Sequence, residues 1–474
     1  MDAHRWLTFC RILSVFVFAG LVTGCVENDY PSSLRYPLRD DPILVKPLET
    51  TPTGFDKPGE LFDLLKKVRD EKDKNNILPI RLVSVQKRSV EALLRQLFGR
   101  PRFPQVNGVD PAIIEELKLD EDTLAEGSRL YRLHCLHCHG LTGNGRGPTA
   151  PWVNPHPRDY RPGIFKFTSS GQIEQQRKPL RSDLVRTLRQ GIEGTSMPSF
   201  GLLPDDEIEA LVSYVIHLSI RGQTEMLVLS DLMEKNKARE QKELSPEEQR
   251  KEVEAELANL QEFALQVVEN VAREWQQAQS SLIVPLTEAP ENLRTAGASP
   301  TSEVAKESIR NGFELFMSAK AGCGGCHQDF GRKERFLNDA WGTIVRPADL
   351  VKGVYRGGRR PIDLYWRIHS GVNGAGMPAI FNGLRPSDSE LKALAAIDKL
   401  DGQTKREAEN LLAEIKRLQL PKEELDVLLT DYDKFTRKDE LKNQLASQRT
   451  WDIVNFLLVL PYPKMRQAHG IDIH

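Results

Sequence analysis

Cysteine is scarce in this chain of 474 residues, and so is net charge. Six cysteines are too few for a disulfide scaffold at this length, so their positions carry more information than their number. A formal net charge of −2 excludes a global field that would attract nucleic acid or an anionic membrane. The length allows two or three domains, each with its own core.

A long apolar run is also lacking at the N-terminus, and this absence favours export over membrane insertion. The apolar run Ile12–Val22 follows two arginines and has eleven residues, about half of the roughly 20 that cross a bilayer. Residues 1–24 therefore read as a signal peptide, which would also remove Cys10. The alternative is an uncleaved anchor over Trp6–Val26.

The residues after that run predict a lipid anchor. Val22-Thr23-Gly24-Cys25 resembles the lipobox of bacterial lipoproteins, in which the cysteine is acylated. We therefore expect lipid on Cys25 and a protein held at the periplasmic side of a membrane, since each buried methylene contributes about 0.8 kcal/mol. Residues 25–120 then predict a tether and a collar. Prolines recur about every five residues from Pro31 to Pro58, which favours an extended tether. Weak helical patterns at Glu60–Arg69, Ser89–Phe98 and Pro111–Leu119 predict the collar.

The rest of the chain repeats one set of signals in one order, which indicates two copies of a domain. The first copy, over residues 121–222, contains Gly127-Ser-Arg-Leu-Tyr131, Cys135-Leu-His-Cys-His139 and Met197-Pro198. The second, over residues 301–465, contains Gly312-Phe-Glu-Leu-Phe316, Cys323-Gly-Gly-Cys-His327 and Met377-Pro378.

Charged helical patterns separate and interrupt the copies. Residues 223–300 form a predicted linker, in which apolar residues recur at spacings of three and four from Val253 to Val271. A second charged helical insertion covers about 387–445, with Leu411, Ile415 and Leu418 on one face. Each segment is either a solvated linker or a docking surface for a partner. Residues 466–474 form a tail.

Each Cys-x-x-Cys-His motif predicts covalent attachment of a c-type haem. One helical turn places the two thiols on the same side, where both can add to the vinyl groups of one haem, and the next histidine can ligate the iron. We therefore expect Cys135, Cys138 and His139 to hold one haem, and Cys323, Cys326 and His327 to hold another. Structural zinc is the rival reading, but it needs four protein ligands, and neither copy offers a second Cys or His pair.

The sixth ligand of each iron is expected from a methionine. Met197 and Met377 are two of only seven methionines, and each occupies a glycine-containing loop just before a proline. Core packing is the usual role of a methionine, but their equivalent positions favour ligation. His/Met ligation raises the reduction potential and leaves no open coordination site, as an electron carrier requires.

These motifs resemble those of class I cytochromes c, found as single domains and as dihaem subunits of bacterial respiratory complexes. The resemblance covers about 121–222 and 301–463, without the insertion, and implies a small all-α fold around each haem. The expected fold class is therefore all-α, with two such domains joined by charged helical segments. Weaker candidates to bind haem propionates are Arg158, Tyr160, Arg161, Arg346, Tyr355, Arg356 and Arg359. Conceivable alternative iron ligands are His134, His137, His156, His217 and His369.

The functional expectation is an electron-transfer protein rather than an enzyme. Two haem c groups would pass single electrons between redox protein partners or subunits of a respiratory complex. We expect no catalytic residue, no small-molecule substrate and no nucleic acid. The alternative is a dihaem peroxidase or a substrate-oxidising cytochrome, which needs an iron with a vacant or displaceable site.

Overall fold

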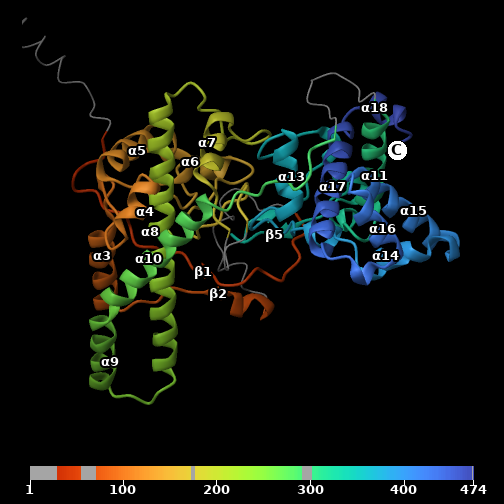
Figure 1. The fold of residues 1–474 in the computed structure, drawn as a ribbon. Coiled ribbons are helices and arrows are strands. Elements are labelled where there is room, and N and C mark those ends of the chain that lie inside the picture. The colour runs from red at the N-terminus through yellow and green to blue at the C-terminus, as the bar shows by residue number, and fades with distance from the viewer. Residues whose placement is uncertain (1–28, 55–70, 172–176, 291–301, 472, 474) are drawn as a thin grey trace, which may run out of the picture.

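The computed structural model describes residues 29–54, 71–171, 177–290, 302–471 and 473. It is mostly helical, with 57% helix and 4% strand, which confirms the all-α fold class. Figure 1 shows two helical bodies, one built around α5 (Glu121–His134) and α8 (Asp205–Glu240), the other around α11 (Glu303–Met317) and α17 (Lys438–Val459). None of the helices in the described part of the chain combines the length and the apolar character needed to cross a bilayer.

A close helix crossing forms the centre of each body, and a glycine makes each crossing possible. A Cβ at Gly127 of α5 would collide with the backbone oxygen of Ala210 in α8, and one at Gly312 of α11 would collide with that of Asp452 in α17. The glycine that opens each repeated motif therefore allows two helices to pack backbone to backbone. α5 and α11 each have a side-chain N-cap. The Asp120 side chain accepts from the Thr123 amide, and the Ser302 side chain accepts from the Ala305 amide.

Short elements complete the two bodies. The first body also contains α3 (Ser84–Phe98), α4 (Pro111–Glu116), α6 (Leu136–His139), α7 (Arg181–Gln190), α9 (Pro246–Ala258) and α10 (Leu260–Gln279). The second also contains α12 (Cys323–Cys326), α13 (Pro361–Ser370) and α18 (Pro463–Ala468). The 3₁₀ turns are η1 (Glu71–Asn76), η2 (Ala150–Trp152), η3 (Gln328–Gly331), η4 (Leu350–Lys352), η5 (Phe381–Leu384), η6 (Leu394–Lys399) and η7 (Tyr432–Lys434).

Strand is confined to three antiparallel pairs of two residues each in the described residues. These are β1 (Ile43–Leu44) with β2 (Ile77–Leu78), β3 (Gly99–Arg100) with β4 (Phe103–Pro104), and β5 (Leu337–Asn338) with β6 (Ile344–Val345). We call residues 337–345 the bridging hairpin, because Figure 1 places β5 between the two bodies.

The predicted linker packs as part of the first body. α8 runs without a break from Asp205 to Glu240, so it crosses the boundary expected at residue 222. α10 then folds back on α8 and buries its apolar face, including Val267, Val271 and the fully buried Trp275. The periodic apolar stripe was therefore a correct sign of a helix, and most of its residues face the core of the first body rather than solvent.

The predicted insertion forms a small helical unit with its own core. It contains α14 (Asp388–Ala393), α15 (Gly402–Arg417) and α16 (Lys422–Thr430), which lie beside α17 on the side away from the first body (Figure 1). Leu411 and Ile415 are buried there, as the pattern predicted. Two buried ion pairs, Arg417 with Asp452 and Arg449 with Glu414, attach the unit to α17.

The described part of the Pro-rich stretch does not form a free tether. Residues 29–54 lie against the first body, where the Tyr36 hydroxyl contacts that of Tyr214 at 2.8 Å and the Arg39 amide donates to Glu225. Asp41 is buried between Arg161 and Arg39, which supply the charge that makes burial of a carboxylate tolerable. The expected collar helices Ser89–Phe98 and Pro111–Leu119 correspond to α3 and α4, whereas Glu60–Arg69 lies outside the described residues.

Candidate functional site

Both Cys-x-x-Cys-His motifs form single helical turns. In the first, the amides of Cys138 and His139 donate to the Cys135 carbonyl at 3.1 and 2.9 Å. In the second, the His327 amide donates to the Cys323 carbonyl at 2.8 Å. Each motif therefore forms the single turn that the spacing predicted, and in the first motif both thiols line one cavity. Burial raises the pKa of Cys135 to about 12 and that of Cys323 to about 11, so both thiols are neutral.

The histidine of each motif has one ring nitrogen held by a backbone carbonyl. His139 Nδ1 lies 3.1 Å from the Arg158 carbonyl, and His327 Nδ1 lies 3.2 Å from that of Ala348. A carbonyl only accepts, so each Nδ1 carries the proton and each Nε2 keeps its lone pair for a metal. Burial lowers the pKa of His139 to about 4 and also lowers that of His327, which keeps both rings neutral. The Tyr160 ring stacks on His139, with centroids 4.8 Å apart.

The two methionine loops share one backbone hydrogen-bond pattern. The Ile192 amide donates to the Met197 carbonyl at 3.1 Å, and the Val372 amide donates to the Met377 carbonyl at 3.0 Å. Each loop follows a glycine, Gly191 or Gly371, with φ of 68° or 72°, where a Cβ would overlap the loop's own backbone. The equivalence expected from the sequence therefore extends to the backbone of the loops.

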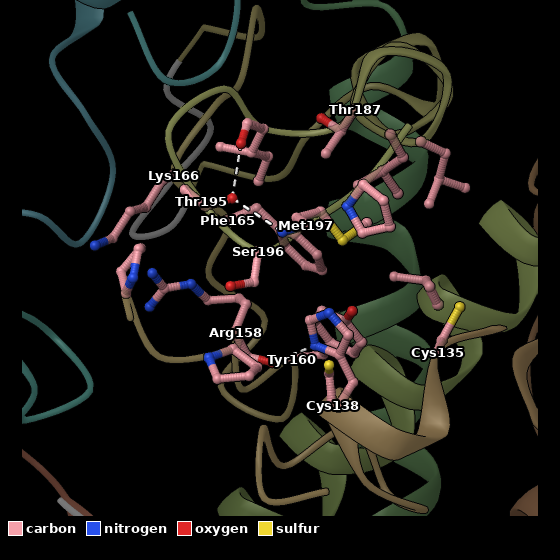
Figure 2. Close-up of a pocket in the computed structure, with 18 of the residues that line it drawn as sticks. Cys135, Cys138, Arg158, Tyr160, Phe165, Lys166, Thr187, Thr195, Ser196 and Met197 are labelled. Carbon is pink, nitrogen blue, oxygen red and sulfur yellow. Dashed lines mark hydrogen bonds between the residues drawn. The ribbon is translucent and has the colours of Figure 1, made fainter. Parts of the chain in front are cut away.

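A cavity of about 280 Å³ joins the predicted residues of the first copy. Cys135, Cys138, His139 and Met197 all line it. Figure 2 shows Met197 across the open space from Tyr160, with the two cysteines on one side and Arg158 and Lys166 on the other. Its other walls are mostly apolar, from Leu184, Leu188, Leu211, Val212 and Val215. Two thiols, an imidazole, a thioether and apolar walls fit a covalent haem with His/Met ligation.

In the second copy, two of the predicted haem-binding residues pack against its own core. Cys323 and Met377 both pack against the second apolar core, and the Phe316 ring lies 6.4 Å from that of His327. Among the described residues, no group of three or more His, Cys, Asp or Glu side chains is placed so that it could hold a metal ion. Cys25 lies outside the described residues.

Of the five alternative histidine ligands, two lie away from the first cavity and three line it. His217 is fully buried but contacts the Phe98 and Gln105 carbonyls of the collar, away from the cavity. His369 contacts Ser370 and packs against Phe381. His134, His137 and His156 line the first cavity beside the predicted ligands.

The candidate propionate ligands are not distributed between the two copies as expected. Some line the first cavity, and others have different partners. Arg158 and Tyr160 line the first cavity, but Arg161 is used in the ion pairs with Asp41 and Asp159. In the second copy, Tyr355 donates to the Leu457 carbonyl and Arg359 donates to the Tyr462 hydroxyl. Arg356, expected at the second haem, lines the cavity of the first.

Three residues of this region gave no sequence signal that we recognised. Lys166 lines the first cavity, and its Nζ lies 3.2 Å from a carboxylate oxygen of Asp339. The Arg158 guanidinium lies 3.6 Å from the centre of the Trp341 ring, whose Nε1 donates to the Asp159 carbonyl at 3.0 Å. Asp339 and Trp341 belong to the bridging hairpin of the second copy, so only contact between the copies reveals their role.

Comparison with known proteins supports the resemblance of the first copy to a cytochrome c. Residues 122–215 match the family described as cytochrome C oxidase, cbb3-type, subunit III, and this segment includes Cys135, Cys138, His139 and Met197. The match covers about a fifth of the chain, and no curated protein matches it. Among solved structures, a chain of the Kuenenia stuttgartiensis reducing HAO-like protein complex is similar at 17% identity, over 71% of this chain and 95% of that chain. Its TM-score of 0.38 is too low to support an argument about fold or function. The segment 122–215 is therefore similar to a cytochrome c domain, and such a domain implies covalently bound haem c and a part in electron transfer.

Proposed function

We propose that this chain is a dihaem cytochrome c that passes single electrons between respiratory-chain partners, as a subunit or a partner of a respiratory complex. The observation that carries the proposal is the repeated frame of ligands. In both copies a carbonyl holds Nδ1 of the motif histidine, and a loop amide holds the carbonyl of the methionine. The second copy therefore has the ligand set and the backbone frame of the copy that matches a cytochrome c family.

The chain's own residues prepare each site for reversible electron exchange. Bound haem would supply the one-electron redox couple. His139 and His327 would ligate the iron through Nε2, because Nδ1 of each is engaged by a carbonyl. Met197 and Met377 would each supply a further ligand to the iron, which would leave no site for a substrate. The apolar wall formed by Leu188, Val212 and neighbouring residues excludes water from the first site.

The proposal includes export and anchoring at the periplasmic face of a membrane through lipid on Cys25. It is supported by the lipobox-like sequence that follows a short apolar run. Mass spectrometry of the native N-terminus should find an acylated Cys25, and Cys25→Ala should abolish that species. An intact, unmodified Met1 would instead favour the uncleaved anchor.

The decisive experiment counts haems on the purified chain. A haemochrome assay should return two haems per polypeptide, and acid–acetone extraction should leave both attached because thioether bonds hold them. Replacing Cys323 and Cys326 by serine should reduce the count to one, and the matched replacement of Cys135 and Cys138 should do the same. A native count of one, or extractable haem, would contradict the proposal.

The iron ligands separate the carrier from the enzyme alternative. Replacing either Met197 or Met377 by histidine should lower the potential of one haem and abolish its methionine-to-iron charge-transfer band. The native protein should bind carbon monoxide slowly and show negligible peroxidase turnover, because His139 with Met197 and His327 with Met377 would leave neither iron an open site. Immediate carbon monoxide binding by one reduced haem would favour a dihaem peroxidase or a substrate-oxidising cytochrome.

A further inference from the structure

Arg356 belongs to the second copy, yet it reaches the haem cavity of the first. It lies at the solvent-accessible edge of that cavity, together with Val345 of the bridging hairpin. The backbone beside it packs so closely on the first body that a Cβ at Gly357 would overlap the ring of Phe167. Gly357 also has a φ of 85°, which a residue with a side chain rarely adopts. The position of Arg356 is therefore fixed by contact between the two copies.

Three cations meet at this edge of the cavity, and one carboxylate accompanies them. Arg158 and Lys166 come from the first copy and Arg356 from the second. Asp339 lies 3.2 Å from Lys166 and 3.8 Å from Arg158. Asp159 is paired with Arg161, and no described carboxylate forms an ion pair with Arg356. Burial, together with the charges of Arg158 and Arg356, lowers the pKa of Lys166 to about 8, although Asp339 opposes the shift. The edge thus has a surplus of two positive charges.

The orientation of a haem in this cavity follows from the positions of the cysteines. In c-type haem the two thioether-bearing pyrroles lie at one edge of the macrocycle and the two propionates at the other. Figure 2 shows Cys135 and Cys138 on one side of the cavity and Arg158 and Lys166 on the opposite side. A haem attached to those cysteines would therefore direct its propionates, with two negative charges, toward the edge that has two positive charges in surplus.

The bridging hairpin holds two of these cations, Arg158 and Lys166, in place. Trp341 supports the Arg158 guanidinium with its ring face, 3.6 Å away, and hydrogen-bonds the neighbouring Asp159 carbonyl. Asp339 is fully buried and accepts from the amides of Trp341 and Thr343, which fixes the hairpin turn. The Ala340 amide donates to the Gly374 carbonyl, in the loop of Met377. The hairpin therefore contacts the propionate edge of the first site and the methionine loop of the second.

We propose that the second copy completes the propionate-binding site of the first haem, with Arg356 binding a propionate beside Arg158 and Lys166, and with Trp341 positioning Arg158. This inference rests on the proposed function, because it requires a haem at Cys135 and Cys138. It makes the potential of the first haem depend on the second copy. A cation beside a propionate stabilises the reduced haem over the oxidised haem, so Arg356 raises the potential of the first haem.

The test is a redox titration of the full-length holoprotein at low ionic strength. Arg356→Gln should decrease the equilibrium constant for reduction of the first haem about threefold. For one electron this lowers the potential by roughly 28 mV. The two haems are assigned by Met377→His, which displaces the potential of the second. Arg356→Lys should restore most of the shift, because it keeps the charge.

Arg359→Gln is the matched control. It removes the same charge three residues away, but Arg359 is exposed and hydrogen-bonds Tyr462 rather than lining the cavity. Trp341→Leu should also lower the first potential and change the propionate bending band in resonance Raman spectra. Two haems per chain with equal shifts in the Arg356→Gln and Arg359→Gln variants would overturn this inference. A native chain that has no covalent haem at Cys135 and Cys138 would instead overturn the proposed function.

Discussion

At the scale of single residues, His217 shows how burial of a histidine can make the stability of the folded protein depend on pH. Its Nε2 lies 3.2 Å from the Phe98 carbonyl and 3.1 Å from the Gln105 carbonyl, and its ring stacks on Tyr214. The side chain is fully buried, and this burial lowers its pKa from 6.5 to about 4. The protonated ring is therefore much less stable in the folded protein than in the unfolded chain.

This difference predicts the direction of a pH effect on stability. Between about pH 6.5 and 4 the unfolded chain binds a proton at His217 and the folded protein does not, so the free energy of unfolding falls as the pH falls. The full difference of about 2.5 units corresponds to at most about 3 kcal/mol. His217→Gln should keep a donor to the carbonyls and show a shallower loss between pH 7 and 4.5 in urea unfolding. Parallel curves for the native and variant proteins would contradict the prediction.

Sequence reasoning at this scale succeeded where the chemistry is local. Cys135, Cys138 and His139 share one turn of the chain, so their spacing alone predicts their geometry. Arg356 shows the opposite case. Its place in the repeat suggests the second haem, yet packing between the copies directs it to the first cavity. No pattern along one chain segment reports a contact between residues about 200 positions apart.

At the scale of elements, the N-terminal segment 29–54 is attached to the first body by a buried charge network. Asp41 accepts from both Nη atoms of Arg161, at 2.7 and 2.9 Å, and pairs with Arg39 and Arg146. Burial by itself would raise the pKa of Asp41, but Arg161 and Arg39 outweigh it and hold that pKa well below its usual range. The carboxylate is therefore ionised throughout the neutral range and holds three arginines.

Removing that charge should loosen the segment. Asp41→Asn leaves Arg39 and Arg161 buried with less compensation, and breaking a buried pair in this way costs about 3 kcal/mol. We expect faster hydrogen exchange and proteolysis within residues 29–54, with both haems retained. The neighbouring Asp40 is exposed, so Asp40→Asn is a control with the same chemistry and should have little effect. Equal exchange rates in the two variants would show that the network does not attach the segment.

The sequence patterns predicted where helices form better than they predicted what those helices pack against. The apolar stripe in the 223–300 segment and the face of the 387–445 insertion were both visible, and both are buried. The stripe could not show that α10 packs on α8, or that the insertion has a core of its own, because amphipathic periodicity identifies a face without identifying what covers it. Proline spacing likewise indicated an extended backbone, but it did not reveal that Asp41 and Tyr36 attach that backbone to the first body.

At the scale of the whole molecule, one short segment connects the two bodies through hydrogen bonds to both. We call residues 281–290 the strap. On the first body, the Ser281 carbonyl accepts from the Gly171 amide and the Ile283 amide donates to the Ser169 carbonyl. On the second, the indole of Trp366 donates to the Ile283 carbonyl at 2.9 Å. Further along the strap, the Thr287 carbonyl accepts from the indole of Trp451 at 3.0 Å.

Contacts outside the strap also join the bodies. Arg177 of the first body donates to the carbonyls of Ser370 and Gly371 in the second, and the Asn373 side chain donates back to the Arg177 carbonyl. Of these bonds, those to Gly371 and from Asn373, and that of the bridging hairpin to Gly374, lie in the loop of Met377, a predicted iron ligand. The two bodies that would hold the proposed haems are therefore also joined by contacts that do not depend on the covalent connection between the copies.

This arrangement predicts that the chain can be cut without separating its haems. A protease site inserted between residues 295 and 296, outside the described residues, would leave the strap on the first half. The halves should then co-elute in gel filtration with both haems, because the strap, the hairpin and Arg177 still join them.

Each hydrogen bond contributes about 1 kcal/mol and an unpaired buried carbonyl costs about as much again. Replacing Trp366 and Trp451 by phenylalanine in the cut protein should therefore shift the halves toward dissociation on dilution. Replacing the exposed Trp152 by phenylalanine is the matched control and should leave the association unchanged. Halves of the otherwise native chain that separate at once after cleavage would show that the two bodies are held together by the chain alone. A fixed path between the two proposed haems would then have no structural basis.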